Sequence, residues 1–503
     1  MPFLNEKKTW INGVFALFIL GNVALSPNLI FLNLYALVMG LLIINRIHWE
    51  TRSELLYYFV LLFSVMDFAY NLPVMGRFNI YYLHIALFIL TLSMFISFIR
   101  KRPSLSIKRL ASNRYLLFLS IFIAYMVVSL AWAESRSAGI KYMINYAIMI
   151  CFMIAVYTFN PNREKVKETL KVLLYTSIPI LFIGLLEVAK IRMPIRNVYL
   201  DNGWYVKGVE YLQTIPTVFF YNPNNFGVFL VMLMSFTVPF IVYNRSKGKN
   251  TLFWGMQLLA LINLIFSTSR TGYIVMLMTM TGFIFFFLLM KEWKKFRKAL
   301  VVGLATMILF QALSFVPDLG VYYGKFNDTP LLSRLGFHSR VPKNLPLAQF
   351  GEEGSANERW TMMVNITKGV VLEGHPQGFG VNNTGLFLKK QGNTHGLVNP
   401  HSLWFEVLGD FGIGIFLYFI FIYLNMLWDL LRIYIETRKK VAYGLTSYLT
   451  VSLIAALGGF ILTAFAPSTV ISFPQMWLLY GLAVSVILRR KVFLEGESKE
   501  PLE

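Results

Sequence analysis

A histidine that follows an asparagine–proline pair is the first candidate for chemistry in this sequence. Asparagine caps the first turn of a helix well, and proline suits the first helical position because its missing N–H would have no partner there. Asn399 and Pro400 therefore predict a helix start, with His401 in its first turn. The positive end of a helix favours a neutral imidazole and attracts anions, which suits a general base for a hydroxyl nucleophile. The alternative for His401 is a structural histidine at an interface.

Two arginines are candidates for binding an anion. Arg270 lies in the short connection 267–272 between two hydrophobic runs and has no acidic residue near it in the sequence. An unpaired arginine beside hydrocarbon is costly, and its planar fork of N–H donors suits phosphate. The alternative is a side chain that reaches out to lipid headgroups. Arg359 opens a helical pattern, but its neighbour Glu358 could be its partner.

A second asparagine–proline start lies in residues 221–225. Helix capping explains Asn222, whereas Asn224 and Asn225 remain for a ligand such as sugar hydroxyls. Ser269, directly before Arg270, is a further candidate for substrate binding.

Several metal and nucleotide motifs are missing from the sequence. It has no Asp-x-Asp or Glu-x-Asp pair, no His-Glu-x-x-His zinc motif and no phosphate-binding P-loop. The single cysteine, Cys151, leaves no disulfide framework and no thiolate metal site. We therefore expect no metal and no cofactor, with arginines in place of a cation.

The elements that must position these residues are membrane helices. Hydrophobic residues make up 56% of the 503 residues, charged residues 14%, and the mean hydropathy is +0.59. A soluble protein of this size could not bury that much apolar surface. Spanning a bilayer takes about 20 helical residues, so the sequence predicts an all-α polytopic membrane protein with about 14 transmembrane helices (12–14). The hydrophobic runs lie near residues 10–26, 28–45, 55–70, 78–99, 115–132, 140–158, 169–189, 217–243, 251–267, 272–290, 299–315, 402–427, 443–464 and 468–488.

The basic residues indicate which side of the membrane each loop faces. With the N-terminus inside, every predicted inner loop holds at least two Lys or Arg, and most of the 46 basic residues lie in these loops. The formal charge of +21 then reflects anchoring at the inner leaflet and not binding of nucleic acid. We expect both termini in the cytoplasm.

A long polar segment divides the predicted helices into two groups. Residues 1–315 form helices 1–11, residues 316–400 one large extracytoplasmic loop, residues 401–488 helices 12–14, and residues 489–503 a cytoplasmic tail. An amphipathic helix against the membrane or the bundle is predicted in the loop, with Asn357 as its N-cap. Its apolar face would consist of Trp360, Met363, Val364, Thr367 and Val371. The glycine-rich residues 375–383 that follow must be loop.

Four motifs resemble those of the O-antigen ligase/polymerase superfamily, over residues 210–430. They are Ser-x-Ser-Arg270, Asn-Glu-Arg359-Trp, Pro376-x-Gly378-x-Gly380-x-Asn382 and the run from Asn399-Pro-His401 to Gly414. The last motif is the most specific, and its residues most resemble those of the teichuronic acid polymerase-like members of Gram-positive bacteria. Residues 1–200 match only as hydrophobic spans. Family members often have asparagine where this chain has Ser402, and its polar segment is longer than in a minimal member.

The resemblance implies a metal-independent, inverting glycosyltransferase of the multi-spanning, C-type class. The implied donor is an oligosaccharide on undecaprenyl pyrophosphate, and the site would lie on the extracytoplasmic side of the bacterial plasma membrane. An acceptor glycan, the lipid bilayer and other polysaccharide-assembly proteins would be the remaining partners. By motif, the catalytic histidine falls on His401 and the pyrophosphate-binding arginines fall on Arg270 and Arg359.

Three other functions are compatible with a polytopic chain. A ligase would transfer the finished glycan to a lipid or protein anchor, whereas a polymerase would extend another lipid-linked glycan; polymerase is favoured. A lipid-linked oligosaccharide flippase would need basic residues along a cavity at mid-membrane depth, and the hydrophobic runs contain few. A non-enzymatic scaffold would leave Arg270 and His401 without a reason to come together.

Overall fold

The computed structural model describes residues 49–66, 71–74, 78–101, 113–191, 210–244, 246–327, 348–440, 444–466 and 470–495. These residues belong to two compact units. The smaller unit comprises Met1–Arg100 and Val172–Pro223, and the larger comprises Lys101–Lys171 and Asn224–Glu503. The first two hydrophobic runs, 10–26 and 28–45, lie outside the described residues.

The smaller unit contains helices and one short β-hairpin. Its helices are α3 (Trp49–Val65), α4 (Tyr82–Lys101) and most of α8 (Arg163–Val188), followed by the 3₁₀ turn η1 (Glu210–Thr214). The antiparallel strands β1 (Asn71–Val74) and β2 (Phe78–Tyr81) pair between α3 and α4. Apart from this hairpin, the regular elements of the described residues are helices, as expected for an all-α membrane protein.

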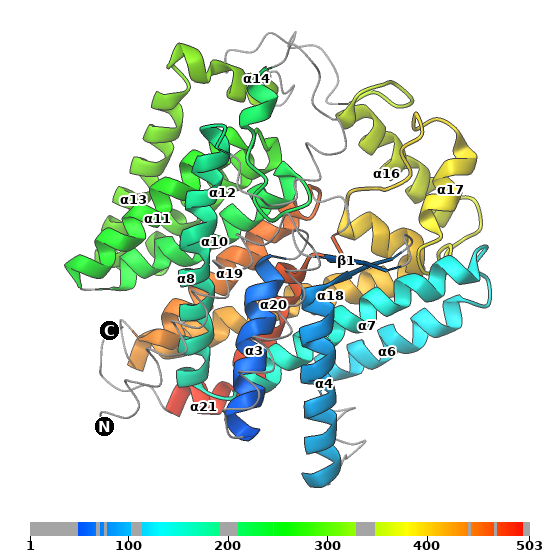
Figure 1. The fold of residues 1–503 in the computed structure, drawn as a ribbon, viewed down its shortest axis with the longest axis horizontal. Coiled ribbons are helices and arrows are strands. Elements are labelled where there is room, and N and C mark those ends of the chain that lie inside the picture. Colours follow the sequence, from blue (N-terminus) through cyan, green and yellow to red (C-terminus); the bar gives the residue numbers. More distant parts are fainter. Residues whose placement is uncertain are drawn as a thin grey trace. The chain divides into compact units, whose positions relative to one another are not determined.

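In the larger unit, the regular elements of the described residues are all helices (Figure 1). Every predicted hydrophobic run in it forms a helix. They are α6 (Arg114–Ser129), α7 (Arg136–Phe159), α10 (Pro223–Tyr243), α11 (Lys247–Phe266), α12 (Arg270–Leu289), α13 (Trp293–Leu313), α18 (Leu403–Lys440), α19 (Leu445–Thr463) and α20 (Pro474–Leu488). Shorter elements are η2 (Pro317–Leu319), α14 (Gly320–Asn327), α16 (Ser355–Val371), α17 (Thr384–Gln391) and α21 (Arg490–Glu495).

Length and composition make this a multi-pass membrane protein. Among the described residues, eight helices are long and apolar enough to cross a membrane, and α6, α20 and part of α3 are shorter apolar helices. The polytopic helical class is thereby confirmed. The number of 14 spans stays a prediction, because the first two runs are not described.

The predicted inner loops of the larger unit meet at one end of its helices. Arg438 donates to Met290 O at 2.7 Å, which joins the ends of α18 and α12. Arg489, after α20, donates to Tyr157 O near the end of α7 at 2.5 Å. Loops predicted to share one side therefore lie together. That this side is the cytoplasmic one remains a prediction from the basic residues.

Helix α16 packs with a different face from the predicted one. Met362, Ile366 and Val370 are buried, and they form an apolar cluster with Phe379, Leu388 and Leu408 that holds α16 against α18. Trp360 and Val371 of the predicted face are 47% and 54% exposed. The helix has two apolar stripes, and the one with Met362, Ile366 and Val370 packs against α18. The N-cap is Gly354 and not Asn357, whose side chain accepts from Gln349 N–H outside the helix.

Helix α18 is interrupted about one quarter of the way along its length, at Gly412. Gly412 has φ 72° and ψ −175°, so the helical hydrogen bonds cannot continue through it. The glycine-rich loop fills the break: Ile413 N–H donates to Pro376 O at 2.9 Å, and Phe379 N–H donates to Gly409 O at 2.7 Å. Backbone groups that the break would leave unpaired in an apolar setting are thus satisfied. Figure 1 shows α16 and α17 beside this part of α18.

Helix α6 and the turn that follows it hold the same loop from its other side. Tyr125 Oη donates to Gln377 O at 2.9 Å, and Trp132 Nε1 donates to Gly378 O at 3.1 Å. Asn383 Oδ1 accepts from Ser135 N–H at 2.7 Å. The glycine-rich loop is therefore fixed between α18 and the α6–α7 turn.

Substitution of Gly412 by alanine is expected to destabilise the larger unit. A Cβ there would lie 2.1 Å from Pro376 O, and a left-handed φ costs a non-glycine residue about 1–3 kcal/mol. The expected result is a lower apparent Tm in detergent, measured by intrinsic fluorescence. Gly414→Ala is the matched control, because a Cβ at Gly414 would meet nothing within 4 Å. Equal Tm values for the two variants would contradict the proposed tight fit of loop and helix.

Candidate active site

Arg270 is the first residue of α12. Ser269 is its N-cap, and the Ser269 Oγ accepts from Gly272 N–H at 3.3 Å. Thr268, just before the cap, has a left-handed φ of 54°, which turns the chain sharply between α11 and α12. Within the described ranges, Arg270 makes no hydrogen bond and no ion pair. Its guanidinium thus remains available for an anion.

Ser269 has a structural role in addition to its predicted one. It is buried, and it packs so closely on α10 that a Cβ at Gly227 would lie 2.9 Å from the Ser269 Oγ. This contact places the start of α10 next to the start of α12. A part in substrate binding for Ser269 stays a prediction.

His401 was predicted to lie in the first turn of a helix. In the structure it precedes α18. The helix begins at Leu403, and His401 has a left-handed φ of 50°. Asn399 does not cap the helix; its Oδ1 accepts from His401 N–H at 2.9 Å and stabilises this turn. A left-handed non-glycine residue costs about 1–3 kcal/mol and persists only where the surroundings enforce it. His401 still lies at the positive end of α18.

The C-terminal end of α19 joins Arg359 to the start of α18. Arg359 Nη1 donates to Phe465 O at 3.0 Å, and Leu403 N–H donates to Ala464 O at 3.1 Å. These two carbonyls are consecutive and lie just beyond the last turn of α19, where helix carbonyls lack partners. Arg359 and the His401 turn are therefore brought to the same helix end.

Arg270 and Arg359 are close enough to repel each other. Burial lowers the pKa of Arg359, the positive charge of Arg270 lowers it further, and Glu358 partly opposes both effects. Both guanidinium groups keep their charge at neutral pH, since arginine is not deprotonated in proteins. An anion bound between them would relieve the repulsion. Arg270, Arg359 and His401, far apart in the sequence, therefore gather at one end of the larger unit.

The three asparagines fall on both sides of the boundary between the two units. Asn222 is buried at the end of the smaller unit, directly before α10. Asn224 and Asn225 occupy the first turn of α10 in the larger unit, where Asn224 is partly exposed and Asn225 is buried. The α10 start adjoins Ser269, so Asn224 is placed near the Arg270 end of the unit.

Two buried carboxyl groups of α18 were not among the predicted site residues. Asp410 accepts from Thr384 Oγ1 at 2.6 Å and from Asn382 N–H at 2.7 Å, and so fixes the end of the glycine-rich loop. Glu406 is also buried, and its Oε2 has no hydrogen-bond partner among the described residues. Both lie within a motif that was noted only for its resemblance. A pair of acidic residues four apart in a hydrophobic run was the available signal.

Acidic, histidine and cysteine side chains do not gather elsewhere in the described part of the chain. No group of three or more of them there could hold a metal ion. The two guanidinium groups at this end suit an anionic ligand.

Comparisons with known proteins show which family this part of the chain resembles. Residues 255–422, which contain both arginines and the histidine, match the O-antigen ligase family model. The match confirms the resemblance to the O-antigen ligase/polymerase superfamily. The chain is also 25% identical over 301 residues to the teichuronic acid biosynthesis protein TuaE of Bacillus subtilis (strain 168). That similarity covers 58% of this chain and 56% of the relative, so the chain matches little more than half of TuaE's length.

Proposed function

We propose that the protein is a membrane glycosyltransferase that polymerises a cell-surface polysaccharide. Its donor would be a glycan on undecaprenyl pyrophosphate, and its site would lie on the extracytoplasmic side of the bacterial plasma membrane. The gathering of two arginines and one histidine at one end of the larger unit carries this proposal. The match to the O-antigen ligase family supports the same chemistry.

The proposed reaction divides the work between the base and the two cations. His401 accepts the proton of an acceptor-sugar hydroxyl, and that oxygen attacks the anomeric carbon. The bond from this carbon to the pyrophosphate oxygen breaks on the opposite face, so the configuration inverts. Arg270 and Arg359 stabilise the charge that grows on the leaving pyrophosphate. Such preorganised groups act strongly because they need no rearrangement as the charge develops.

The arginines can bind the leaving group without a metal ion. Arginine offers a rigid fork of donors that matches phosphate oxygens, and two of them supply the charge of one divalent cation. Arg270 and Arg359 are each partly buried, which strengthens their attraction for an anion.

Transfer by the purified protein in lipid nanodiscs is expected to persist in EDTA. The assay would follow extension of an oligosaccharide on undecaprenyl pyrophosphate, with and without excess chelator. Equal rates are expected, because arginines take the place of the cation. A loss of activity that Mg²⁺ or Mn²⁺ restores would contradict the metal-independent mechanism.

Deletion of the gene distinguishes a polymerase from a ligase. A polymerase mutant is expected to accumulate single repeat units on the lipid carrier, measured by size analysis of extracted lipid-linked glycans. A ligase mutant would instead accumulate full-length polymer on that carrier. The relative's name, a teichuronic acid biosynthesis protein, supports polysaccharide assembly and leaves the acceptor open.

A further inference from the structure

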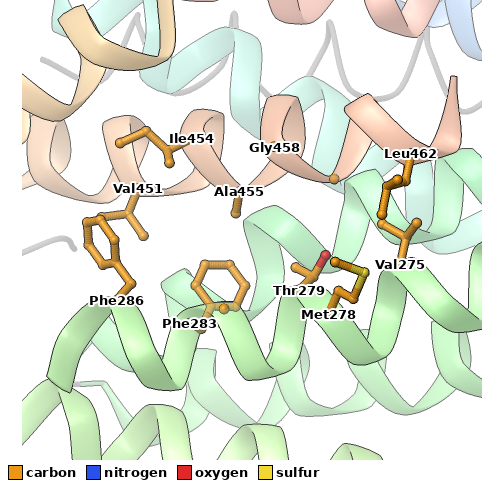
Figure 2. A pocket seen from close by; sticks show the side chains of 12 residues that line it. Val275, Met278, Thr279, Phe283, Phe286, Val451, Ile454, Ala455, Gly458 and Leu462 are labelled. Carbon is orange, nitrogen blue, oxygen red and sulfur yellow. The ribbon is translucent and has the colours of Figure 1, made fainter. Parts of the chain in front are cut away.

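An apolar groove runs along the larger unit between α12 and α19. Its volume is about 240 Å³. Figure 2 shows Val275 and Leu462 at one end, and Phe286 and Val451 at the other. At 1.5 Å per helical residue, the stretch from Val275 to Phe286 is about 16 Å long, roughly half of a bilayer's hydrocarbon thickness.

Missing side chains create this groove. Gly282 on α12 and Gly458 on α19 both line it, and a Cβ at either position would meet nothing within 4 Å. Met278, on the rim, is 54% exposed, so the groove is open along one side. Thr279 contributes the one hydroxyl of the lining, and the other lining groups are apolar. The groove suits a flexible hydrocarbon chain.

One end of the groove adjoins the candidate active site. Val275 follows Arg270 by little more than one turn of α12. Leu462 lies near the end of α19, directly before the carbonyls of Ala464 and Phe465 that bind the α18 start and Arg359. The end of the groove next to the two arginines is thus cationic, and the groove itself is apolar. A ligand complementary to both parts has an anionic headgroup and a long hydrocarbon chain.

We propose that this groove holds the donor's isoprenoid chain, with its first two units between Arg270 and the position of Gly282, about 18 Å further along α12. The proposal rests on the proposed function and adds a site for the lipid to it. A second apolar cavity, between α6, α7, α18 and α20, has a volume of about 100 Å³. Its lining includes Leu403 but no residue of α12, the helix that Arg270 begins. The α12–α19 groove is therefore the better match for a chain whose headgroup binds Arg270.

Filling the groove is expected to weaken binding of long-chain donors only. In Gly282→Leu and Gly458→Leu the new side chain would occupy the slot without backbone clash. We expect KM for an undecaprenyl pyrophosphate-linked donor to rise about 10-fold, as for lost burial of about two CH₂ groups. With a donor carrying only two isoprene units, KM should equal that of the wild-type protein. Gly255→Leu on α11 is the matched control, since its Cβ would also meet nothing within 4 Å.

The outcomes separate failure of the groove from failure of the function. Wild-type protein that transfers no sugar from either donor would refute the proposed function. Activity with equal KM values for all variants and both donors would refute the groove alone. A uniform loss with both chain lengths would show damage to the fold and also count against the groove.

Photolabelling locates the chain directly. The probe is undecaprenyl pyrophosphate with a diazirine on its third isoprene unit, bound to wild-type protein in nanodiscs. Labels are expected on Phe283 and Ile454 of the groove, and excess unmodified undecaprenyl pyrophosphate should remove them. Labels on Trp477 or Tyr480 of the second cavity would overturn the assignment. Equal competition by phosphatidylglycerol would also overturn it, because the groove would then bind ordinary lipid.

Discussion

His401→Asn is expected to lower kcat by about 10²–10⁴-fold while the fold stays intact, because the general base is lost. Asparagine suits the position, since it adopts the left-handed conformation of His401 more readily than most residues. The variant therefore removes the imidazole without adding backbone strain. The measurement is single-turnover transfer from the lipid-linked donor, beside the apparent Tm of each protein.

His395→Asn is the matched control for this variant. His395 also lies in the polar segment and has a left-handed φ of 49°, but its Nε2 pairs with Gly351 O at 3.1 Å on the exposed surface. Its replacement should leave kcat within about twofold, as for a surface change away from the site. A His401→Asn protein that extends the glycan at the wild-type rate would refute the assigned base.

Replacing Arg270 or Arg359 with lysine is expected to lower kcat by about 10²–10³-fold, the usual effect of removing one preorganised donor. Lysine retains the charge but lacks the planar fork that binds two phosphate oxygens together. The double variant should lose less than the product of the single losses, because both side chains act on one pyrophosphate. Steady-state kinetics of the wild-type protein, the two single variants and the double variant give a double-mutant cycle.

Arg432→Lys is the control for the arginine variants. Arg432 is exposed on α18 at the predicted cytoplasmic end and stacks on Trp428, with its guanidinium carbon 5.2 Å from the ring centre. Its replacement should leave kcat unchanged. Fully independent effects of Arg270 and Arg359 would contradict a shared ligand.

The hydrophobic pattern predicted the helices well because each span must satisfy its own backbone in hydrocarbon. Runs such as 140–158 and 272–290 correspond closely to α7 and α12. Helix ends were predicted less well at the membrane surface. The predicted inner loop 428–442, for instance, is largely a continuation of α18, since polar residues extend a helix as readily as they end it.

The candidate site was predicted in composition but not in geometry. Sequence spacing singled out Arg270, Arg359 and His401, whereas the bonds of Arg359 and Leu403 to the end of α19 depend on the tertiary fold. The left-handed turn at His401 could not be foreseen, because the Asn-Pro pair also fits a regular helix start. A glycine and an aspartate inside a hydrophobic run could have indicated the break at Gly412. The loop that fills the break, residues 376–383, lies about 30 residues earlier in the sequence and could not be paired with it from the pattern.

The docking of the glycine-rich loop into the α18 break has a consequence for exchanging parts between relatives. Residues 376–383 complete their hydrogen bonds with backbone groups of α18 and with the turn after α6. The glycine-rich loop is thus not a detachable module, and a soluble fragment that contained it would lack these bonding partners. Chimeras that aim to change sugar preference would have to transplant the α6–α7 turn, this segment and the first three turns of α18 as a set.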